Sequence, residues 1–108
     1  MQVIKLYLPM KDNDGDDLMY LHSLFIGDIA DEDRITGFTR FEAEGFWFDG
    51  STSYKDDIKI YEFHVANKDI GYVHGRLRRH AVTLCRQMKQ ECIYLQLNNE
   101  TELVKGDK

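Results

Sequence analysis

The fold is decided by the stretch FTRFEAEGFWFDGSTSYKDDIKIYEFHV, residues 38–65. Residues 38–48 alternate in two sets, and residues 57–65 are rich in β-branched and aromatic side chains, which is typical of strands. The intervening DGSTSYK supplies the Asp, Gly and Ser that favour a turn. We therefore predict a β-hairpin in the middle of the chain.

Further strands and helices flank this hairpin in a regular order. Residues 2–8 and residues 91–97 alternate with a period of two, which predicts one strand near each end. Apolar residues at helical spacing predict two helices, one over residues 18–29 and one over residues 70–88. The predicted order is βαββαβ, and residues 98–108 are expected to form a polar C-terminal tail.

This order is that of the ferredoxin-like fold, an α+β fold in which both helices cover one face of a four-stranded antiparallel sheet. We expect one such domain over residues 1–97. Both alternating sets of the hairpin contain large apolar residues, Phe46 and Phe48 in one and Phe41 and Trp47 in the other. A face exposed to water should be polar, so we predict that the uncovered face meets another copy of the chain.

Composition limits the class of protein. The chain has 108 residues, 43% hydrophobic and 31% charged, which suits one folded domain and not a disordered segment. No apolar run approaches the roughly 20 residues of a membrane span. Two cysteines outside any metal-binding spacing indicate a reducing compartment. We expect a cytoplasmic protein that does not contact membranes.

Charge is distributed unevenly along the chain. The first 57 residues hold 5 Lys and Arg against 13 Asp and Glu, whereas the remaining 51 hold 9 against 6. An acidic protein does not suit nucleic-acid binding, which depends on neutralising phosphates, so we predict no nucleic-acid partner. The second helix carries a group of basic residues: Arg76, Arg78, Arg79, Arg86 and Lys89. We favour their pairing with the acidic half of the chain or with a neighbouring subunit over the binding of an anion.

The sequence gives little support for a metal site or a catalytic nucleophile. The acidic run at Asp12, Asp14, Asp16 and Asp17 fails the EF-hand pattern, because its sixth position is not glycine and its twelfth is not glutamate. We interpret it as a solvated turn. The four histidines share no ligand spacing, and a buried inert thiol explains Cys85 better than a nucleophile paired with His64 or His80. We predict neither a metal nor a cofactor.

The hairpin carries the most informative chemistry. Phe46, Trp47 and Phe48 follow Gly45, and the turn leads through Tyr54 to an acidic pair. Aromatic faces attract cations and stack on adenine-like rings, and a neighbouring carboxylate suits a cation or a ribose hydroxyl. The alternative is that these aromatic residues only pack in the core and at an interface. Composition and spacing leave both interpretations open.

This pattern resembles that of the phage-encoded S-adenosylmethionine lyases, small trimeric proteins with a fold like the PII signalling proteins. In that family a glycine and an aromatic residue precede a turn, an acidic pair, a strand and a helix, and a Gln-acid pair precedes the last strand. The resemblance covers about residues 37–97. Here the pattern reads Gly45-Phe46-Trp47, Asp56-Asp57-Ile58-Lys59-Ile60, a helix over 68–88 and Lys89-Gln90-Glu91-Cys92-Ile93-Tyr94-Leu95.

The resemblance implies a substrate site between subunits, against the hairpin. It implies that Asp57, or else Asp56, stands in for a catalytic acid at the start of the third strand, and that Trp47 stands in for a tyrosine. This aspartate is one methylene shorter than the family's acid, and the indole lacks the family's hydroxyl. The other residues expected to bind substrate are Phe46, Gly45, Tyr54, Gln90 and Glu91.

The implied activity is the degradation of S-adenosylmethionine to methylthioadenosine and homoserine lactone by a cytoplasmic homotrimer. Such an enzyme would let a phage evade methyl-dependent restriction. The alternative from another class is a non-catalytic oligomer that binds a nucleotide-like ligand or a host protein. A purely structural oligomer is a third hypothesis.

Overall fold

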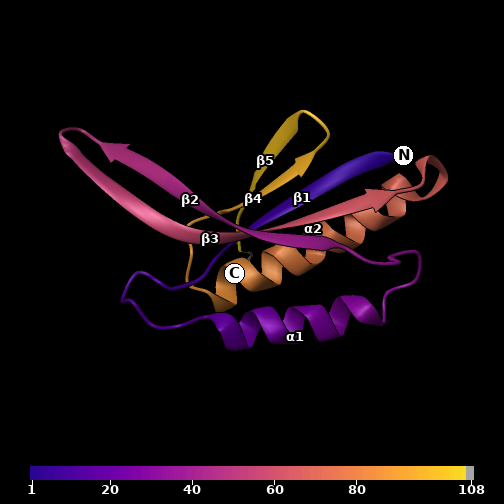
Figure 1. Cartoon of the computed structure of the whole chain (residues 1–108), viewed down its shortest axis with the longest axis horizontal. Coiled ribbons are helices and arrows are strands. Elements are labelled where there is room, and N and C mark those ends of the chain that lie inside the picture. The colour runs from indigo at the N-terminus through magenta and orange to yellow at the C-terminus, as the bar shows by residue number, and fades with distance from the viewer. Residues whose placement is uncertain (107–108) are drawn as a thin grey trace.

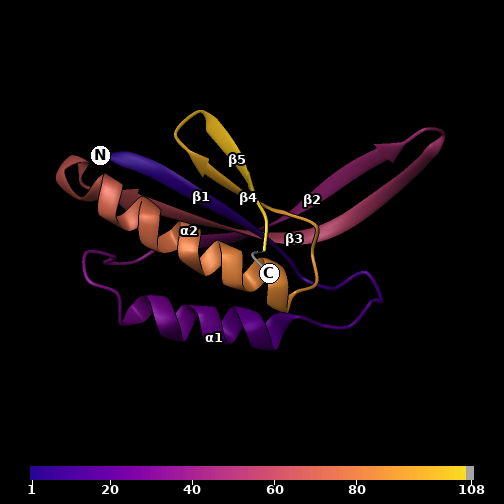
Figure 2. The same cartoon turned by 180° about the vertical axis from the view of Figure 1, so that it is seen from behind.

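The computed structural model describes residues 1–106 and has an α+β architecture. Its five strands form one antiparallel sheet in the order β2-β3-β1-β4-β5. Both helices lie on the same side of this sheet (Figures 1 and 2). The elements in chain order are β1 (Gln2–Pro9), α1 (Met19–Ala30), β2 (Thr39–Asp49), β3 (Thr52–Val65), the 3₁₀ turn η1 (Asn67–Asp69), α2 (Ile70–Gln87), β4 (Ile93–Leu97) and β5 (Glu100–Val104).

The central strand β1 confirms the alternation predicted from its sequence. Ile4, Leu6 and Leu8 are fully buried and form the sheet side of the core. Ile4 pairs with Phe63 and Leu6 pairs with Tyr61, so these two β3 side chains reach the same side. The core therefore lies between the helices and one face of the sheet.

The buried faces of both helices are those predicted from the spacing of their apolar residues. Val73, Leu77 and Ala81 of α2 are fully buried, as expected for a face that repeats every three or four residues. Phe25 and Ile29 do the same in α1. No helix within residues 1–106 is long and apolar enough to cross a membrane.

Arg76 and Arg78 of α2 pair with acids: Arg76 with the acidic half of the chain, as we favoured, and Arg78 with an acid of the other half. Arg76 donates hydrogen bonds to Glu32 through Nε and Nη2, and Nη2 lies 2.7 Å from Oε1. His80 Nε2 lies 3.0 Å from the same oxygen. Arg78 binds Glu102 of β5 at 2.8 Å. The hydrogen bond from Arg76 lowers the pKa of the Glu32 carboxyl. These contacts tie α2 to the end of α1 and to the sheet edge.

The prediction of four strands was wrong, because the sheet has five. Residues 100–104, which we assigned to a polar tail, form β5 and pair with β4. Their polar composition hid one anchor: Val104 is fully buried and pairs with Ile93. Residues 107–108 of the predicted tail lie outside the described residues.

The hairpin connection is shorter than its sequence suggested. We expected a turn over residues 49–55, but β3 begins at Thr52 and only two residues separate the strands. Gly50 adopts a left-handed φ of 60°, which a two-residue turn of this kind requires. The strands therefore continue past the body of the sheet as a projecting arm (Figure 1). The molecule is accordingly elongated, measuring 45 × 29 × 28 Å.

The apolar residues of the hairpin divide between the two faces in a way that the sequence did not reveal. Tyr61 and Phe63 of β3 are buried under the helices. Phe41 and Trp47 lie on the uncovered face, and each is 41% exposed. An uncovered face with large apolar side chains is thus present, and its contact with another copy remains a prediction.

Replacing Val104 by Ala tests whether β5 is part of the packed domain. The variant loses two buried methyl groups and leaves a small cavity, so we expect the free energy of unfolding to fall by about 2 kcal/mol. Urea denaturation followed by circular dichroism measures this. Leu103→Ala is the matched control, because Leu103 is 53% exposed, and its effect should stay within about 0.5 kcal/mol. Equal losses in both variants would contradict the packing described here.

Candidate functional site

A cavity of about 590 Å³ lies on the sheet face that the helices leave uncovered. Its walls come from the β2–β3 hairpin, the end of β1, and the segment that leads from α2 into β4. Ile58 and Ile60 contribute apolar surface from β3. Sites for small ligands commonly have volumes of about 300–1,000 Å³ and mainly apolar walls. The cavity therefore has the size and lining of a small-molecule site.

Three aromatic side chains from three different strands meet at this cavity. Trp47 of β2 and Tyr94 of β4 pack edge to face, with ring centroids 5.3 Å apart and planes at 88°. Tyr7 of β1 lies 6.1 Å from Tyr94, centroid to centroid. Tyr7 donates a hydrogen bond of 3.0 Å to Gln96 Oε1, whereas the Tyr94 hydroxyl has no hydrogen-bond partner within residues 1–106. Burial raises the pKa of Tyr94, which keeps this phenol a hydrogen-bond donor.

Tyr7 and Tyr94 were absent from our predicted site. Their signal was present in the pairing of the two end strands: β1 and β4 are neighbours, and Tyr7 pairs directly with Tyr94. Each also stands on the side of its strand opposite to the buried residues. A ferredoxin-like strand order, followed through to these two positions, would have placed the two rings together.

Strand alternation decides which of the predicted hairpin residues belong to the cavity face. Gly45, Trp47 and Asp56 share the face of Ile58, and all three line the cavity. The indole of Trp47 lies beside Gly45, where an added Cβ would be 3.6 Å from the indole Nε1. Tyr54 pairs with Trp47 on the same face but is not among the residues that line the cavity.

Asp57 and Phe46 occupy the other face of the arm. Asp57 pairs with Glu44, and both carboxylates contact the Lys55 ammonium, at 3.7 Å and 2.7 Å respectively. The hydrogen bond that Lys55 donates to Glu44 raises the pKa of Lys55, so this lysine stays charged. Phe46 borders the cavity through its place in β2, but its side chain belongs to the Lys55 face and is 59% exposed. Within one copy of the chain, Asp56 and not Asp57 is therefore the carboxylate beside the aromatic cluster.

Gln90 and Glu91 both line the cavity from the segment that precedes β4. Gln90 is held by the end of α2: its side-chain amide donates to the Met88 carbonyl at 3.0 Å, and its backbone N–H donates to the Cys85 carbonyl at 2.9 Å. The Cys85 thiol in turn donates to the Gln90 carbonyl at 3.2 Å. These contacts give Gln90 a structural part in shaping the wall. Glu91 is exposed and makes no ion pair among the described residues.

No nucleophile–base pair of cysteine and histidine occurs within residues 1–106. Cys85 is buried and bonded to the Gln90 carbonyl. His80 contacts Glu32, and His64 Nε2 lies 2.9 Å from Glu62 Oε2. Burial raises the pKa of Cys92, the thiol that lines the cavity, so it remains protonated. The interpretation of Cys85 as an inert thiol fits these contacts.

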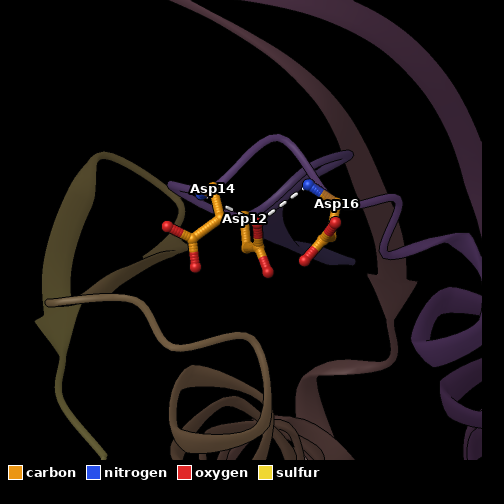
Figure 3. Close-up of side chains that lie close together, drawn as sticks. All are labelled: Asp12, Asp14 and Asp16. Atoms are coloured by element: carbon orange, nitrogen blue, oxygen red, sulfur yellow. Dashed lines mark hydrogen bonds between the residues drawn. The ribbon is translucent and has the colours of Figure 1, made fainter.

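The acidic turn brings Asp12, Asp14 and Asp16 together (Figure 3), with one carboxylate oxygen of each within 4.8 Å of the others. One oxygen of Asp12 already accepts hydrogen bonds of 2.9 Å from the backbone N–H groups of Asp14 and Asp16. Gly15 closes the turn with a φ of 84°. The carboxylates of Asp14 and Asp16 are exposed. Hydrogen bonds within the turn give Asp12 a structural role, and the interpretation as a solvated turn stays a prediction.

A buried polar network lies beneath the end of β1. His22 of α1 is fully buried, with Nε2 2.8 Å from the carbonyl of Pro9 and Nδ1 2.7 Å from the Tyr61 hydroxyl. Because a carbonyl only accepts, Nε2 carries the proton and Nδ1 accepts from Tyr61. Burial lowers the pKa of His22, so the ring is neutral. Pro9 lines the cavity on the other side, and His22 therefore anchors part of its wall.

This network predicts a pH-dependent stability. Because the folded His22 binds a proton less readily than the unfolded chain, whose histidines titrate near 6.5, stability should fall as the pH drops below about 6.5. Urea unfolding between pH 7.5 and 5.0 measures the slope. His22→Gln should flatten it, and His74→Gln, a change at a partly exposed helix position, should leave it intact. An unchanged slope in His22→Gln would exclude His22 as its source.

Comparison with known proteins gives matches in structure and none in sequence. No family model and no curated protein matches this sequence. Two solved structures match over nearly the whole chain at 8% sequence identity. A phage SAM lyase in its apo state has a TM-score of 0.71 and covers 99% of this chain and 90% of its own. A phage SAM lyase in complex with S-methyl-5′-thioadenosine has a TM-score of 0.68 and covers 97% and 89% respectively.

The fold is that of the phage SAM lyases. The resemblance stated from short motifs is thus matched by an independent agreement in three dimensions. At 8% identity this agreement establishes the fold alone. The case for an activity must come from the residues of the cavity.

Proposed function

We propose that this chain is an S-adenosylmethionine lyase with a PII-like, ferredoxin-like fold, which releases methylthioadenosine and homoserine lactone. The observation that carries the proposal is the cavity, where Trp47, Tyr94 and Asp56 meet on the uncovered face of the sheet. A nucleoside with a sulfonium needs aromatic surface for its base and its cation, together with a carboxylate for its hydroxyl or amino groups. Both are present here.

The proposed reaction requires orientation and little else from the protein. The carboxylate of the substrate's methionine part attacks its own γ-carbon and forms the ester bond of the lactone. The bond from that carbon to sulfur breaks, and its electron pair stays on sulfur, so the sulfonium becomes a neutral thioether. Fixing the two reacting groups in the attack geometry contributes about 7–11 kcal/mol in favourable intramolecular cases. This mechanism needs no general base, covalent nucleophile or metal.

In this proposal each residue of the cavity has a defined part. Trp47 packs against the adenine or the sulfonium, and Asp56 binds the amino group or a ribose hydroxyl. Glu91 adds a second carboxylate, and Gln90 fixes the segment that carries Glu91. Asp57, the first of our two predicted acids, lies on the other face of the arm beside Lys55, so Asp56 is the acid we assign within one subunit.

We further propose a homotrimer in which neighbouring copies cover the exposed sheet face and close the cavity. Phe41 and Trp47 supply apolar surface on the cavity face of the arm, and Phe46 and Phe48, 59% and 81% exposed, supply it elsewhere on the arm. In such an assembly the face that carries Asp57 can contribute to the site of a neighbour. Its setting would be the host cytoplasm, where destroying the methyl donor lets a phage evade methyl-dependent restriction.

The activity is tested by incubating the pure protein with S-adenosylmethionine and following methylthioadenosine by chromatography. We expect release by the natural chain and a loss of about tenfold or more in Asp56→Asn, since a hydrogen bond to a charged group contributes about 1.5–3 kcal/mol. Asp57→Asn is the matched control, because it removes the neighbouring charge from the other face. Binding without release would favour the non-catalytic alternative. Loss only in Asp57→Asn would move the acid to the neighbouring subunit's face.

The assembly is tested by sedimentation at micromolar concentration. We expect the natural chain to sediment as a trimer and Phe41→Glu as a monomer, because a buried unpaired carboxylate is strongly unfavourable at an apolar interface. Leu24→Glu is the control: Leu24 is 59% exposed on α1, on the helical side of the sheet, and its variant should remain trimeric. A natural chain that sediments as a monomer would contradict the trimer.

A further inference from the structure

We infer that the cavity selects its ligand by positive charge, binding an adenosine derivative that carries a sulfonium in preference to the corresponding neutral thioether. The inference rests on the proposed function, because it takes its ligand class from there. It adds a basis for specificity and for the release of product. Three features of the cavity carry it: its uncompensated carboxylates, its aromatic cluster, and the free phenol of Tyr94.

The first feature is the balance of charge. Asp56 and Glu91 line the cavity, and neither is in an ion pair among the described residues. Within residues 1–106, no Lys, Arg or His borders the cavity. Glu44 also borders the cavity, but its carboxylate is paired with Lys55 on the other face of the arm. A cation entering the cavity therefore meets two carboxylates with no competing partner.

The second feature is the aromatic cluster. Trp47 is the best of the aromatic side chains at attracting a cation, and the faces of Tyr94 and Tyr7 add to the same wall. Such contacts contribute about 0.5–1 kcal/mol at exposed sites and about 2 kcal/mol or more once water is excluded. A neutral sulfur in the same position keeps the apolar contact but loses the electrostatic part.

The third feature is the Tyr94 hydroxyl. It has no hydrogen-bond partner among the described residues, whereas the Tyr7 hydroxyl is already bonded to Gln96. Tyr94 is therefore free to donate to an acceptor on the ligand, such as the carboxylate of a methionine part. In this arrangement the Tyr94 hydroxyl binds the carboxylate of the ligand, and the aromatic rings bind its sulfonium.

Loss of charge during the reaction then favours release. When the bond between the γ-carbon and sulfur breaks, the electron pair stays on sulfur and the positive charge at that atom disappears. The nucleoside product no longer attracts the carboxylates or the aromatic faces. The same groups that hold the substrate thus have less hold on the product.

The chain contains a single tryptophan, Trp47, and it lies in the cavity, so its fluorescence reports binding directly. Stopped-flow quenching before turnover would give dissociation constants for S-adenosylmethionine, S-adenosylhomocysteine and methylthioadenosine. The first two share their skeleton except for the methyl group that charges the sulfur. We expect S-adenosylmethionine to bind at least about tenfold more tightly than either thioether, a difference of about 1.4 kcal/mol. The ratio should fall as salt is added.

Variants identify the source of this ratio. Glu91→Gln, at an exposed position, and Tyr94→Leu should each lower it by about threefold or more, while S-adenosylhomocysteine affinity in Glu91→Gln stays within about twofold. Leu103→Ala, outside the cavity, should leave it unchanged. Equal affinity for sulfonium and thioether in the natural chain, or a ratio that survives both cavity variants, would overturn the inference. Selective binding without methylthioadenosine release would leave it standing and remove the proposed lyase activity instead.

Discussion

Two helices cover only one face of a five-stranded sheet, and the rest of the molecule follows from that limit. The covered face holds the core, with Leu6, Tyr61 and Leu77 fully buried between the layers. The opposite face carries Phe41 and Trp47 of β2, Tyr7 of β1 and Tyr94 of β4. A single copy of the chain has no element left to cover these side chains. Any ligand or neighbouring subunit that binds here therefore gains apolar contact that the fold itself leaves unused.

The projecting arm turns this uncovered face into a concave site. A flat sheet would expose Trp47 to water on one side, but β2 and β3 run past the end of the central strands and enclose a cavity with the segment before β4. Alternation along the arm then separates two chemical environments within a few ångströms. Asp56 faces the aromatic cluster, and Asp57, one residue later, faces Lys55 and Glu44. The arm serves the cavity with one face and is available to a neighbour with the other.

The sequence predicted structural features that depend on a repeating pattern, but not those that depend on the position of a single residue. The buried faces of β1 and α2 followed from periods of two and of three to four. The acidic pair at residues 56–57 could not be resolved, because a shift of one residue in a strand reverses the face, and the exact position of the hairpin turn was unknown. Residues 100–104 look like a tail because only Val104 in them is buried. Tyr7 and Tyr94 became neighbours through strand pairing, which no local pattern encodes.

The position of β1 also has a consequence for how the chain acquires its shape. Strand β1 occupies the middle of the sheet, and its two partners lie far along the chain: Gln2 pairs with Val65, and Ile4 pairs with Leu97. While β1 emerges from the ribosome neither of its partner strands has been made, so the sheet cannot close until β4 is synthesised. Such distant pairings slow folding and leave strand edges exposed meanwhile. Rapid completion of translation, or a chaperone that shields the nascent β1, would protect this small domain from aggregation.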